Sequence, residues 1–167
     1  GGKEAPASAS PSKQVKPSVT ASPSLETPPM AKAAPPPGFV APPPPAPVSV
    51  ARYSYRQPAK PAAGDRAKAQ PIFAEGLNAH RERRLAAAIA AYREALKLDP
   101  SFYQANYNLG LAAYEVNDLG QSLIAYEYAL AIEPGSADAR YNLALSLEQA
   151  RFYLDAANEL EKLLADR

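Results

Sequence analysis

The sequence predicts an all-α protein in which three helix-turn-helix repeats, within residues 69–167, follow a disordered, Pro/Ala-rich basic tail at residues 1–66. Two observations lead to this prediction. Prolines and small polar residues dominate the first part of the chain, whereas a fixed period, equal to the spacing from Pro100 to Pro134, runs through the second part. Within each period, apolar residues recur at spacings of three and four in two separate stretches, which is typical of two helices joined by a turn.

The tail cannot build a core of its own. Of the 19 prolines, all but Pro71, Pro100 and Pro134 lie before residue 62, and large apolar side chains are few there. Ordering the backbone costs roughly 1–2 kcal/mol per residue, which such a segment cannot offset by burial. We therefore predict disorder throughout residues 1–66.

Two segments of the tail allow a more specific interpretation. Residues 35–47 favour polyproline II and are interpreted as a semi-rigid spacer, with a ligand for a proline-recognition domain as the alternative. Residues 52–56, Arg-Tyr-Ser-Tyr-Arg, alternate basic and aromatic side chains. We interpret this strip as linker, with docking on a partner or on the acidic domain as the alternative.

The net charge of +1 is the sum of two opposite halves. Residues 1–68 carry nine Lys/Arg against three Asp/Glu, which gives +6, and residues 69–167 carry nine against fourteen, which gives −5. An acidic folded part is a poor nucleic-acid binder. Attraction between the two halves is expected, but salt screens it beyond about 8–10 Å.

The fixed period defines three repeats and six helices. The repeats are expected at residues 69–102, 103–136 and 137–167. The motif Tyr107 to Leu111 recurs as Tyr141 to Leu145, and Pro100 recurs as Pro134. Helices are expected near residues 68–82, 85–98, 103–116, 119–132, 137–150 and 153–165. Ser101 and Ser136 are expected to be N-cap residues, and the two prolines are expected to end the preceding helices.

Small residues occupy equivalent columns of the repeats. They are Gly76, Gly110 and Ala144 on the first helices and Ala88, Ser122 and Ala156 on the second helices. These columns predict close approach of the two helices within a repeat. Tyr92, Tyr126 and Leu160 are expected to wedge into the contact with the neighbouring repeat. Because one hairpin cannot bury both of its faces, stability is expected to come from stacking.

The columns resemble the tetratricopeptide repeat, whose pattern is Trp-x2-Leu-Gly-x2-Tyr, then Ala-x3-Phe-x2-Ala and a late Pro. The second repeat fits best, with Leu109, Gly110, Tyr126, Ala129 and Pro134. It departs from the pattern at Asn106 and Ala113, the first repeat departs at Glu75, and the third at Leu163. The resemblance implies a right-handed α-solenoid that acts as a protein-interaction scaffold.

In this family the first helices line a concave groove, so the resemblance implies where a protein or peptide ligand would bind. The implied groove residues are Phe73, Leu77, Tyr107, Asn108, Leu111, Tyr114, Tyr141, Asn142, Leu145 and Glu148. Tyrosine gives contact area with a polar end, and an Asn amide pairs with a peptide bond by donating and accepting. Asn108 and Asn142 are the strongest candidates, whereas Tyr107 and Tyr141 are expected to pack partly between helices.

One subtype of the family, which clamps a C-terminal carboxylate, does not fit. That clamp takes cations from the first and third repeats, and the corresponding positions here are Phe73, Asp138 and Asn142. Only Asn108 matches. A free carboxylate would meet Asp138 without a compensating cation, so we expect a different ligand.

The types of residue present argue against an enzyme, a metal site or a bound cofactor. The chain has no cysteine and one histidine, His80, which is interpreted as a surface residue. Carboxylates such as Glu94, Glu127 and Glu161 are interpreted as solvated charge on helix faces. No Gly-rich phosphate loop and no apolar run of membrane-spanning length is present. Localisation stays open between the bacterial cell envelope or periplasm and the cytoplasm.

The last expected helix carries Leu160, Leu163 and Leu164 with no helix after it in the sequence. These side chains are expected to leave an apolar flank uncovered. The sequence therefore predicts a truncated array whose natural protein continues beyond Arg167. The alternative function is an assembly element whose uncovered last helix stacks on another copy of the chain or on further repeats of a longer array.

Overall fold

The structure, a computed structural model, describes residue 43 and residues 49–165. Helices make up most of this part, and it contains no strand. The six helices are α1 (Arg66–Arg81), α2 (Leu85–Leu98), α3 (Tyr103–Glu115), α4 (Leu119–Ile132), α5 (Ala137–Gln149) and α6 (Tyr153–Ala165). The predicted all-α class is confirmed. The predicted tail at residues 1–42 and 44–48, with all of the polyproline spacer except Pro43, lies outside the described residues.

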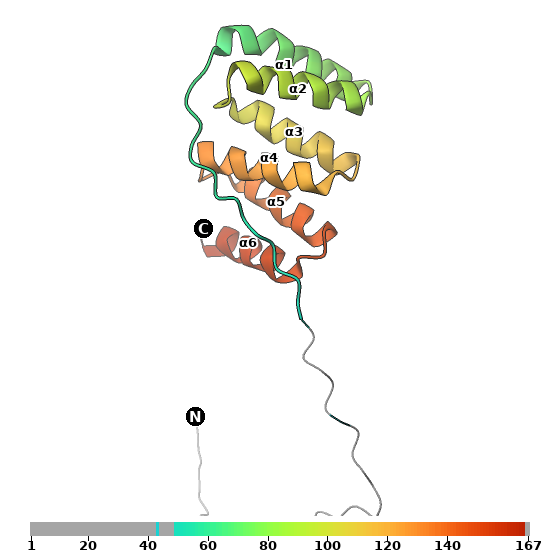
Figure 1. The fold of residues 1–167 in the computed structure, drawn as a ribbon, viewed down its shortest axis with the longest axis vertical. Coiled ribbons are helices and arrows are strands. Elements are labelled where there is room, and N and C mark those ends of the chain that lie inside the picture. Colours follow the sequence, from blue (N-terminus) through green and yellow to red (C-terminus); the bar gives the residue numbers. More distant parts are fainter. Residues whose placement is uncertain (1–42, 44–48, 166–167) are drawn as a thin grey trace, which may run out of the picture. The chain divides into compact units, whose positions relative to one another are not determined.

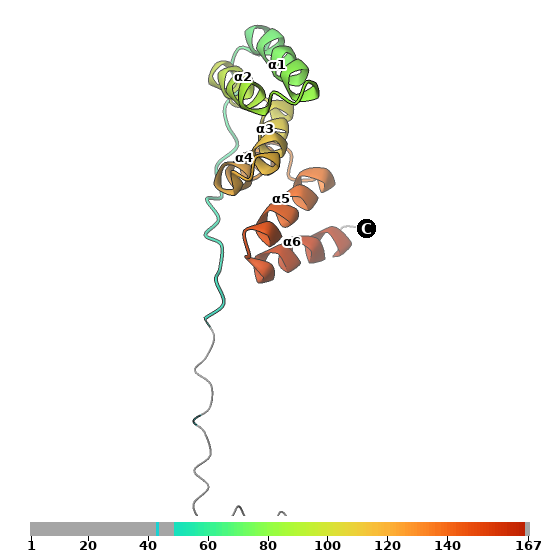
Figure 2. The same ribbon diagram turned by 90° about the vertical axis from the view of Figure 1, so that its right-hand side faces the viewer.

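The helices form three hairpins that stack in chain order (Figure 1). Helix α1 packs on α2, α3 on α4 and α5 on α6, while α2 contacts α3 and α4 contacts α5. One side of the stack is formed by the odd-numbered helices and the other by the even-numbered helices. Figure 2 shows this for the first two repeats, where α1 and α3 lie to the right of α2 and α4. We call these sides the first-helix face and the second-helix face.

Caps and turns explain where the helices begin and end. The side chains of Asp65, Asp118 and Ser136 cap α1, α4 and α5 by accepting backbone N–H groups of the first turn. The prediction for Ser136 is confirmed and that for Ser101 is wrong. Phe102 precedes α3, and Ser101 instead donates its hydroxyl to Asp99 Oδ1 at 2.7 Å.

The turn inside each repeat is a repeated left-handed cap. Arg83, Asn117 and Arg151, at equivalent positions of the three repeats, have φ values of 61°, 60° and 66°. The next amide donates back to the preceding helix in every case, as in the bond of 2.8 Å from Asp118 N to Ala113 O. This is the hydrogen-bond pattern of a Schellman motif, which ends a helix sharply and turns the chain into the second helix.

The small residues allow close packing within each repeat. A Cβ on Gly76 would lie 2.6 Å from Cε1 of Tyr92, and both this tyrosine and Tyr126 are buried. Each tyrosine ring therefore rests on the glycine of its own repeat. Each ring also belongs to a core cluster that includes residues of the next repeat. Leu160, the third member of the column, is 40% exposed, so the prediction that it wedges between repeats is wrong.

Residues 49–65 form an extended segment, which we call the strap, on the side of α2 and α4 (Figures 1 and 2). The prediction of disorder up to residue 66 is therefore wrong for this segment. Hydrogen bonds fix it at both ends, from Arg52 to Asp155 of α6 and from Gly64 N to Asp99 Oδ1 at 3.0 Å. The composition of this segment does not indicate its order, because a few anchoring side chains, rather than a hydrophobic core, hold it in place.

Candidate functional site

Hydrogen bonds join two of the first helices, α3 and α5, along the first-helix face. Asn142 Nδ2 on α5 donates to the Tyr107 hydroxyl on α3 at 2.8 Å. The Tyr114 hydroxyl on α3 donates at 2.9 Å to Oε1 of Gln149, the last residue of α5. These bonds hold polar side chains of different repeats in fixed positions along one surface.

A depression of about 410 Å³ lies between α1 and α3 on this face. Leu77 and Leu111 provide apolar walls, and Asn108, His80 and Arg81 add polar groups at its margin. Three of the predicted groove residues therefore come together here. The combination suits an apolar side chain whose neighbouring peptide groups reach the polar margin.

Asn108 and Asn142 have the same orientation in successive repeats. Their Nδ2 groups donate to the carbonyl oxygens one turn earlier, Gln104 O at 2.7 Å and Asp138 O at 3.0 Å. Among the described residues, no hydrogen bond is formed by either Oδ1 atom. Both side chains are half-buried, so these two acceptors are held at regular positions on the first-helix face.

The other predicted groove residues divide into packing residues and accessible residues. Tyr107 is half-buried, with its ring centroid 5.9 Å from that of Tyr126, and so belongs partly to the core. Tyr141 is 50% exposed, more than the packing role predicted for it implies. Tyr114 and Leu145 are half-buried, and Glu148 is exposed.

Phe73 is not part of the groove. It is 6% exposed and packs against Tyr92 and Phe102, with ring centroids 5.7 Å and 4.7 Å away. Phe73 lies three residues before Gly76, on the side of α1 that faces α2, and this explains its burial. The prediction that it lines the groove is therefore wrong.

His80 is not a surface residue as predicted. Its Nδ1 lies 3.2 Å from the Tyr92 hydroxyl, and its Nε2 lies 2.8 Å from Glu115 Oε1 of the next repeat. Arg83 also pairs with Glu115. Burial raises the pKa of Tyr92 to about 12, so its hydroxyl stays protonated at neutral pH. His80 therefore links the core to the margin of the depression.

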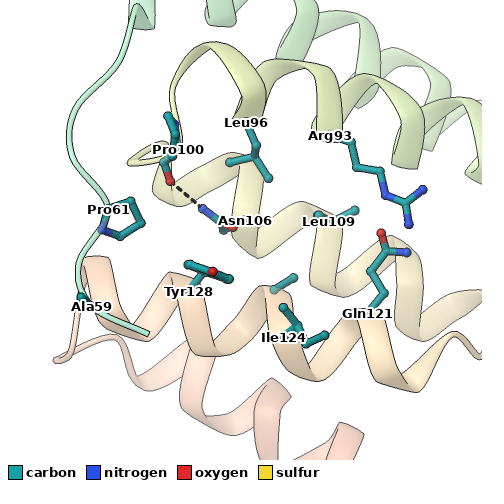
Figure 3. Close-up of a pocket in the computed structure, with 11 residues that line it drawn as sticks. Ala59, Pro61, Arg93, Leu96, Pro100, Asn106, Leu109, Gln121, Ile124 and Tyr128 are labelled. Atoms are coloured by element: carbon teal, nitrogen blue, oxygen red, sulfur yellow. Dashed lines mark hydrogen bonds between the residues drawn. The ribbon is translucent and has the colours of Figure 1, made fainter. Parts of the chain in front are cut away.

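A larger pocket, of about 640 Å³, lies on the second-helix face where the strap passes α2 and α4 (Figure 3). Leu96, Leu109 and Ile124 form its apolar part. Figure 3 shows the guanidinium of Arg93 pointing towards the amide of Gln121 at one end. Ala59 and Pro61 of the strap border the other end, and no local pattern in the sequence indicates that these residues lie beside α2 and α4.

Three carboxylates on the second-helix face are buried. Glu127 on α4 and Asp155 and Glu159 on α6 are 6%, 2% and 2% exposed. The prediction that Glu127 is solvated charge is therefore wrong. Hydrogen bonds from Arg52 are the main cause that lowers the pKa of Asp155. Burial opposes ionisation of Glu159, but hydrogen bonds from Lys162, Tyr55 and Arg140 outweigh it and lower its pKa.

The described residues contain no cluster of His, Cys, Asp and Glu suited to holding a metal ion. Within the same part of the chain, no helix has the length and apolar character needed to cross a membrane.

Comparisons with known proteins agree with the helical-repeat fold described above. A family described as "Tetratricopeptide repeat" matches residues 73–137 and 107–167. A crystal structure of MamA is similar at 26% identity with a TM-score of 0.57, over 58% of this chain and 57% of that chain. This chain thus spans just over half the length of MamA. No curated protein matches the sequence.

Two solved complexes share the fold at lower identity. The first tetratricopeptide domain of Spaghetti (RPAP3), bound to the HSP90 peptide SRMEEVD, is 16% identical with a TM-score of 0.59, over 63% of this chain and 83% of that chain. The TPR2B domain of yeast Sti1, in complex with pHsp70, is 20% identical with a TM-score of 0.56, over 58% and 78%.

Proposed function

Because the chain belongs to the tetratricopeptide repeat family, we propose that it is a protein-interaction module whose first-helix face binds an extended peptide segment of another protein. The observation that carries this proposal is the depression between α1 and α3, where Leu77, Asn108 and Leu111 meet. Its apolar walls and polar margin match the two kinds of group that an extended peptide presents.

The geometry suggests how such a peptide would lie. An apolar side chain would enter the depression, and backbone N–H groups would donate to Oδ1 of Asn108 and of Asn142. The exposed ring of Tyr141 would add contact area at low entropic cost. The ligand would therefore contact at least two repeats, which explains why a stack rather than a single hairpin is needed.

The solved complexes with chaperone peptides support a role in protein interaction, but they do not identify the ligand of this chain. Spaghetti is bound to an HSP90 peptide in its structure. In this chain Phe73 is buried in the core, and Asp138 is an exposed anion on α5. A C-terminal carboxylate would find repulsion there, so we expect no measurable binding of the peptide SRMEEVD to this chain.

A selected peptide provides the direct test. Peptides are chosen from a random library on the immobilised full chain, and the affinity of one of them is measured for wild type and for the double variant Asn108→Ala/Asn142→Ala. Loss of two acceptors should weaken binding by about tenfold or more. The melting temperature should fall only slightly, through loss of the bond from Asn142 to Tyr107.

The matched control is Asn158→Ala, an exposed asparagine on α6. It should leave the affinity for the selected peptide unchanged. Full affinity in the double variant, or loss of its helical signal, would assign Asn108 and Asn142 a structural role and refute the proposed binding mode.

An alternative function is favoured by the apolar surface of α6. Tyr153, Leu154, Leu160 and Leu164 are 57%, 47%, 40% and 67% exposed, whereas Leu163 is half-buried and contributes less than the sequence predicted. We propose self-association through this surface as the second candidate. Sedimentation over a range of concentrations should then show oligomers that the variant Leu160→Glu/Leu164→Glu lacks, and a wild type that stays monomeric would refute it.

A further inference from the structure

The strap contacts the second-helix face through a short run of residues with a clear pattern. Arg52 donates from Nε and Nη2 to Oδ1 of Asp155 at 3.1 Å and 2.9 Å. The Tyr53 amide donates to Oδ2 of the same carboxylate at 2.8 Å. One carboxylate of α6 thus receives a guanidinium and a backbone amide side by side.

The two tyrosines of the run anchor it on two helices. The Tyr53 hydroxyl donates to Glu127 Oε1 on α4, and the Tyr55 hydroxyl donates to Glu159 Oε1 on α6 at 3.0 Å. The Tyr53 ring meets that of Tyr55 edge-on, with centroids 4.9 Å apart, and lies 5.5 Å from that of Phe152. Both side chains combine apolar burial with a buried acceptor, which is typical of anchoring residues in interfaces.

Two further backbone amides complete the contact. The amides of Arg56 and Gln57 donate to Glu127 Oε2 at 2.7 Å and 3.0 Å. Glu127 therefore accepts three hydrogen bonds, all from the strap. The side chain of Ser54, between the two tyrosines, is exposed.

The acceptors belong to the helices and are positioned by them. Arg140 of α5 donates to Glu159 Oε2 at 2.9 Å and Lys162 of α6 donates to Oε1 at 2.7 Å, so the helices hold this carboxylate in place and the strap adds a further donor at Oε1. Burying ionised carboxylates is costly unless donors compensate them. For Glu127 every donor given by the structure comes from residues 53–57. The second-helix face thus has the properties of a binding site for an extended segment.

The strap has the properties of a ligand. It has no secondary structure of its own, and its contacts with α4 and α6 join residues 70 to 104 positions apart in the chain. A short tether gives such a segment an effective concentration on the order of millimolar, so an intramolecular ligand remains bound even when its intrinsic affinity is modest.

We propose that the second-helix face of α4 and α6 is a second peptide-recognition site of this chain, specific for an extended segment with the pattern Arg-Tyr-x-Tyr, and that residues 52–57 occupy it as a tethered ligand. The site is distinct from the first-helix face and does not depend on the function proposed for that face. The same sequence supplied as a free peptide binds there once the tethered copy has been disabled.

The test uses the full chain with its own strap disabled. In the variant Tyr53→Ser/Tyr55→Ser the helices keep every carboxylate of the site. A fluorescent peptide with the sequence of residues 49–60 should bind this variant saturably. Its affinity for the wild type should be lower by about tenfold or more, because the tethered copy competes for the site. Circular dichroism checks that the variant is folded.

Two controls assign the binding to the site. Adding Glu127→Ala to the double variant should abolish peptide binding, whereas adding Glu133→Ala, an exposed carboxylate beyond the end of α4, should not. A peptide with phenylalanine at both tyrosine positions should bind at least several-fold more weakly. Equal binding to the Glu127→Ala and Glu133→Ala variants would overturn the proposal.

Amide hydrogen exchange of the wild type gives an independent test that needs no variant. The amides of Tyr53, Arg56 and Gln57 should be protected, whereas that of Ser54, for which the structure gives no bond, should exchange freely. Exchange of all four at the rate of an unfolded peptide would overturn the proposal. A wild-type dimer that the free peptide dissociates would overturn the tethered assignment, because the segment of a second copy would then be the occupant.

Discussion

Gly110 lies against the face of Tyr126, and no larger residue fits between them. A Cβ at position 110 would lie 2.8 Å from both Cε1 and Cζ of a ring that is 1% exposed. The same relationship recurs between Gly76 and Tyr92 in the first repeat, at 2.6 Å. The thickness of an aromatic ring on a bare backbone thus sets the spacing of the two helices in these repeats.

We predict that Gly110→Ala destabilises the fold by about 1–3 kcal/mol, although alanine is the better helix former, because the added methyl group overpacks a buried contact. The free energy of unfolding in urea measures the effect. Gly120→Ala is the matched control, since its Cβ would come no closer than 3.9 Å to Asp118 Oδ1 and helix propensity should raise stability by up to about 1 kcal/mol. A neutral Gly110→Ala would show that the ring moves aside freely.

The strap should contribute to stability through single hydroxyl groups. Tyr53→Phe removes one donor from the buried Glu127 and should lower the free energy of unfolding by about 1–2 kcal/mol. Tyr141→Phe is the control, because that ring is 50% exposed and its hydroxyl has no hydrogen bond among the described residues, so its effect should stay within about 0.5 kcal/mol. If both variants unfold at the wild-type urea midpoint, the strap is not docked in solution.

The buried carboxylates predict acid sensitivity. The folded state lowers the pKa of Asp155, mainly through Arg52. Burial opposes ionisation of Asp99, but hydrogen bonds from Ser101, Gly64 and Arg66 outweigh it and lower the pKa of this carboxyl to about 2. An unfolded Asp has a pKa of about 3.9. Because the folded values are lower, this stabilisation is complete above the unfolded pKa and is lost as the pH falls through the folded pKa.

Urea unfolding at a series of pH values tests this sign. Stability should fall progressively from about pH 5 towards pH 2. Arg52→Ala should flatten part of that slope, because it removes the main cause of the lowered pKa of Asp155. Lys60→Ala, which removes an exposed cation of the strap outside the docking run, is the control and should keep the wild-type slope. An Arg52→Ala slope identical to wild type would contradict the assignment.

The repeat period was sufficient to predict the helices but not the strap. Helices at 85–98, 119–132 and 153–165 are found where predicted, because a fixed repeat period reports the same local structure three times. The Arg-Tyr-Ser-Tyr-Arg strip occurs once, and its docking on the acidic domain was only an alternative. Its partners lie 70 to 104 residues away, and no local pattern reports such pairs.

The predictions for Phe73 and Glu127 were wrong for related reasons. Phe73 was assigned to the groove by its place on a first helix, yet a helix presents several sides, and this residue lies on the side facing α2. Glu127 was interpreted as solvated because a carboxylate on a helix usually is, and only the strap reveals why this one is buried. Leu77, Asn108 and Leu111 line one depression, because corresponding positions of stacked repeats are neighbours, and their role in binding a peptide stays a prediction.

The turns give the last prediction. Arg151 has a φ of 66°, a left-handed conformation that costs a side-chain-bearing residue roughly 1–2 kcal/mol and costs glycine or asparagine less. Asn117 already occupies the equivalent position of the second repeat with a φ of 60°. We therefore predict that Arg151→Gly raises the free energy of unfolding by about 0.5–1 kcal/mol, with part of the gain lost to the greater freedom of glycine in the unfolded chain. Asn117→Gly is the control and should change stability by less. Both are measured by urea unfolding at neutral pH, and a destabilised Arg151→Gly would show that the arginine side chain contributes more to the third repeat than its backbone conformation costs.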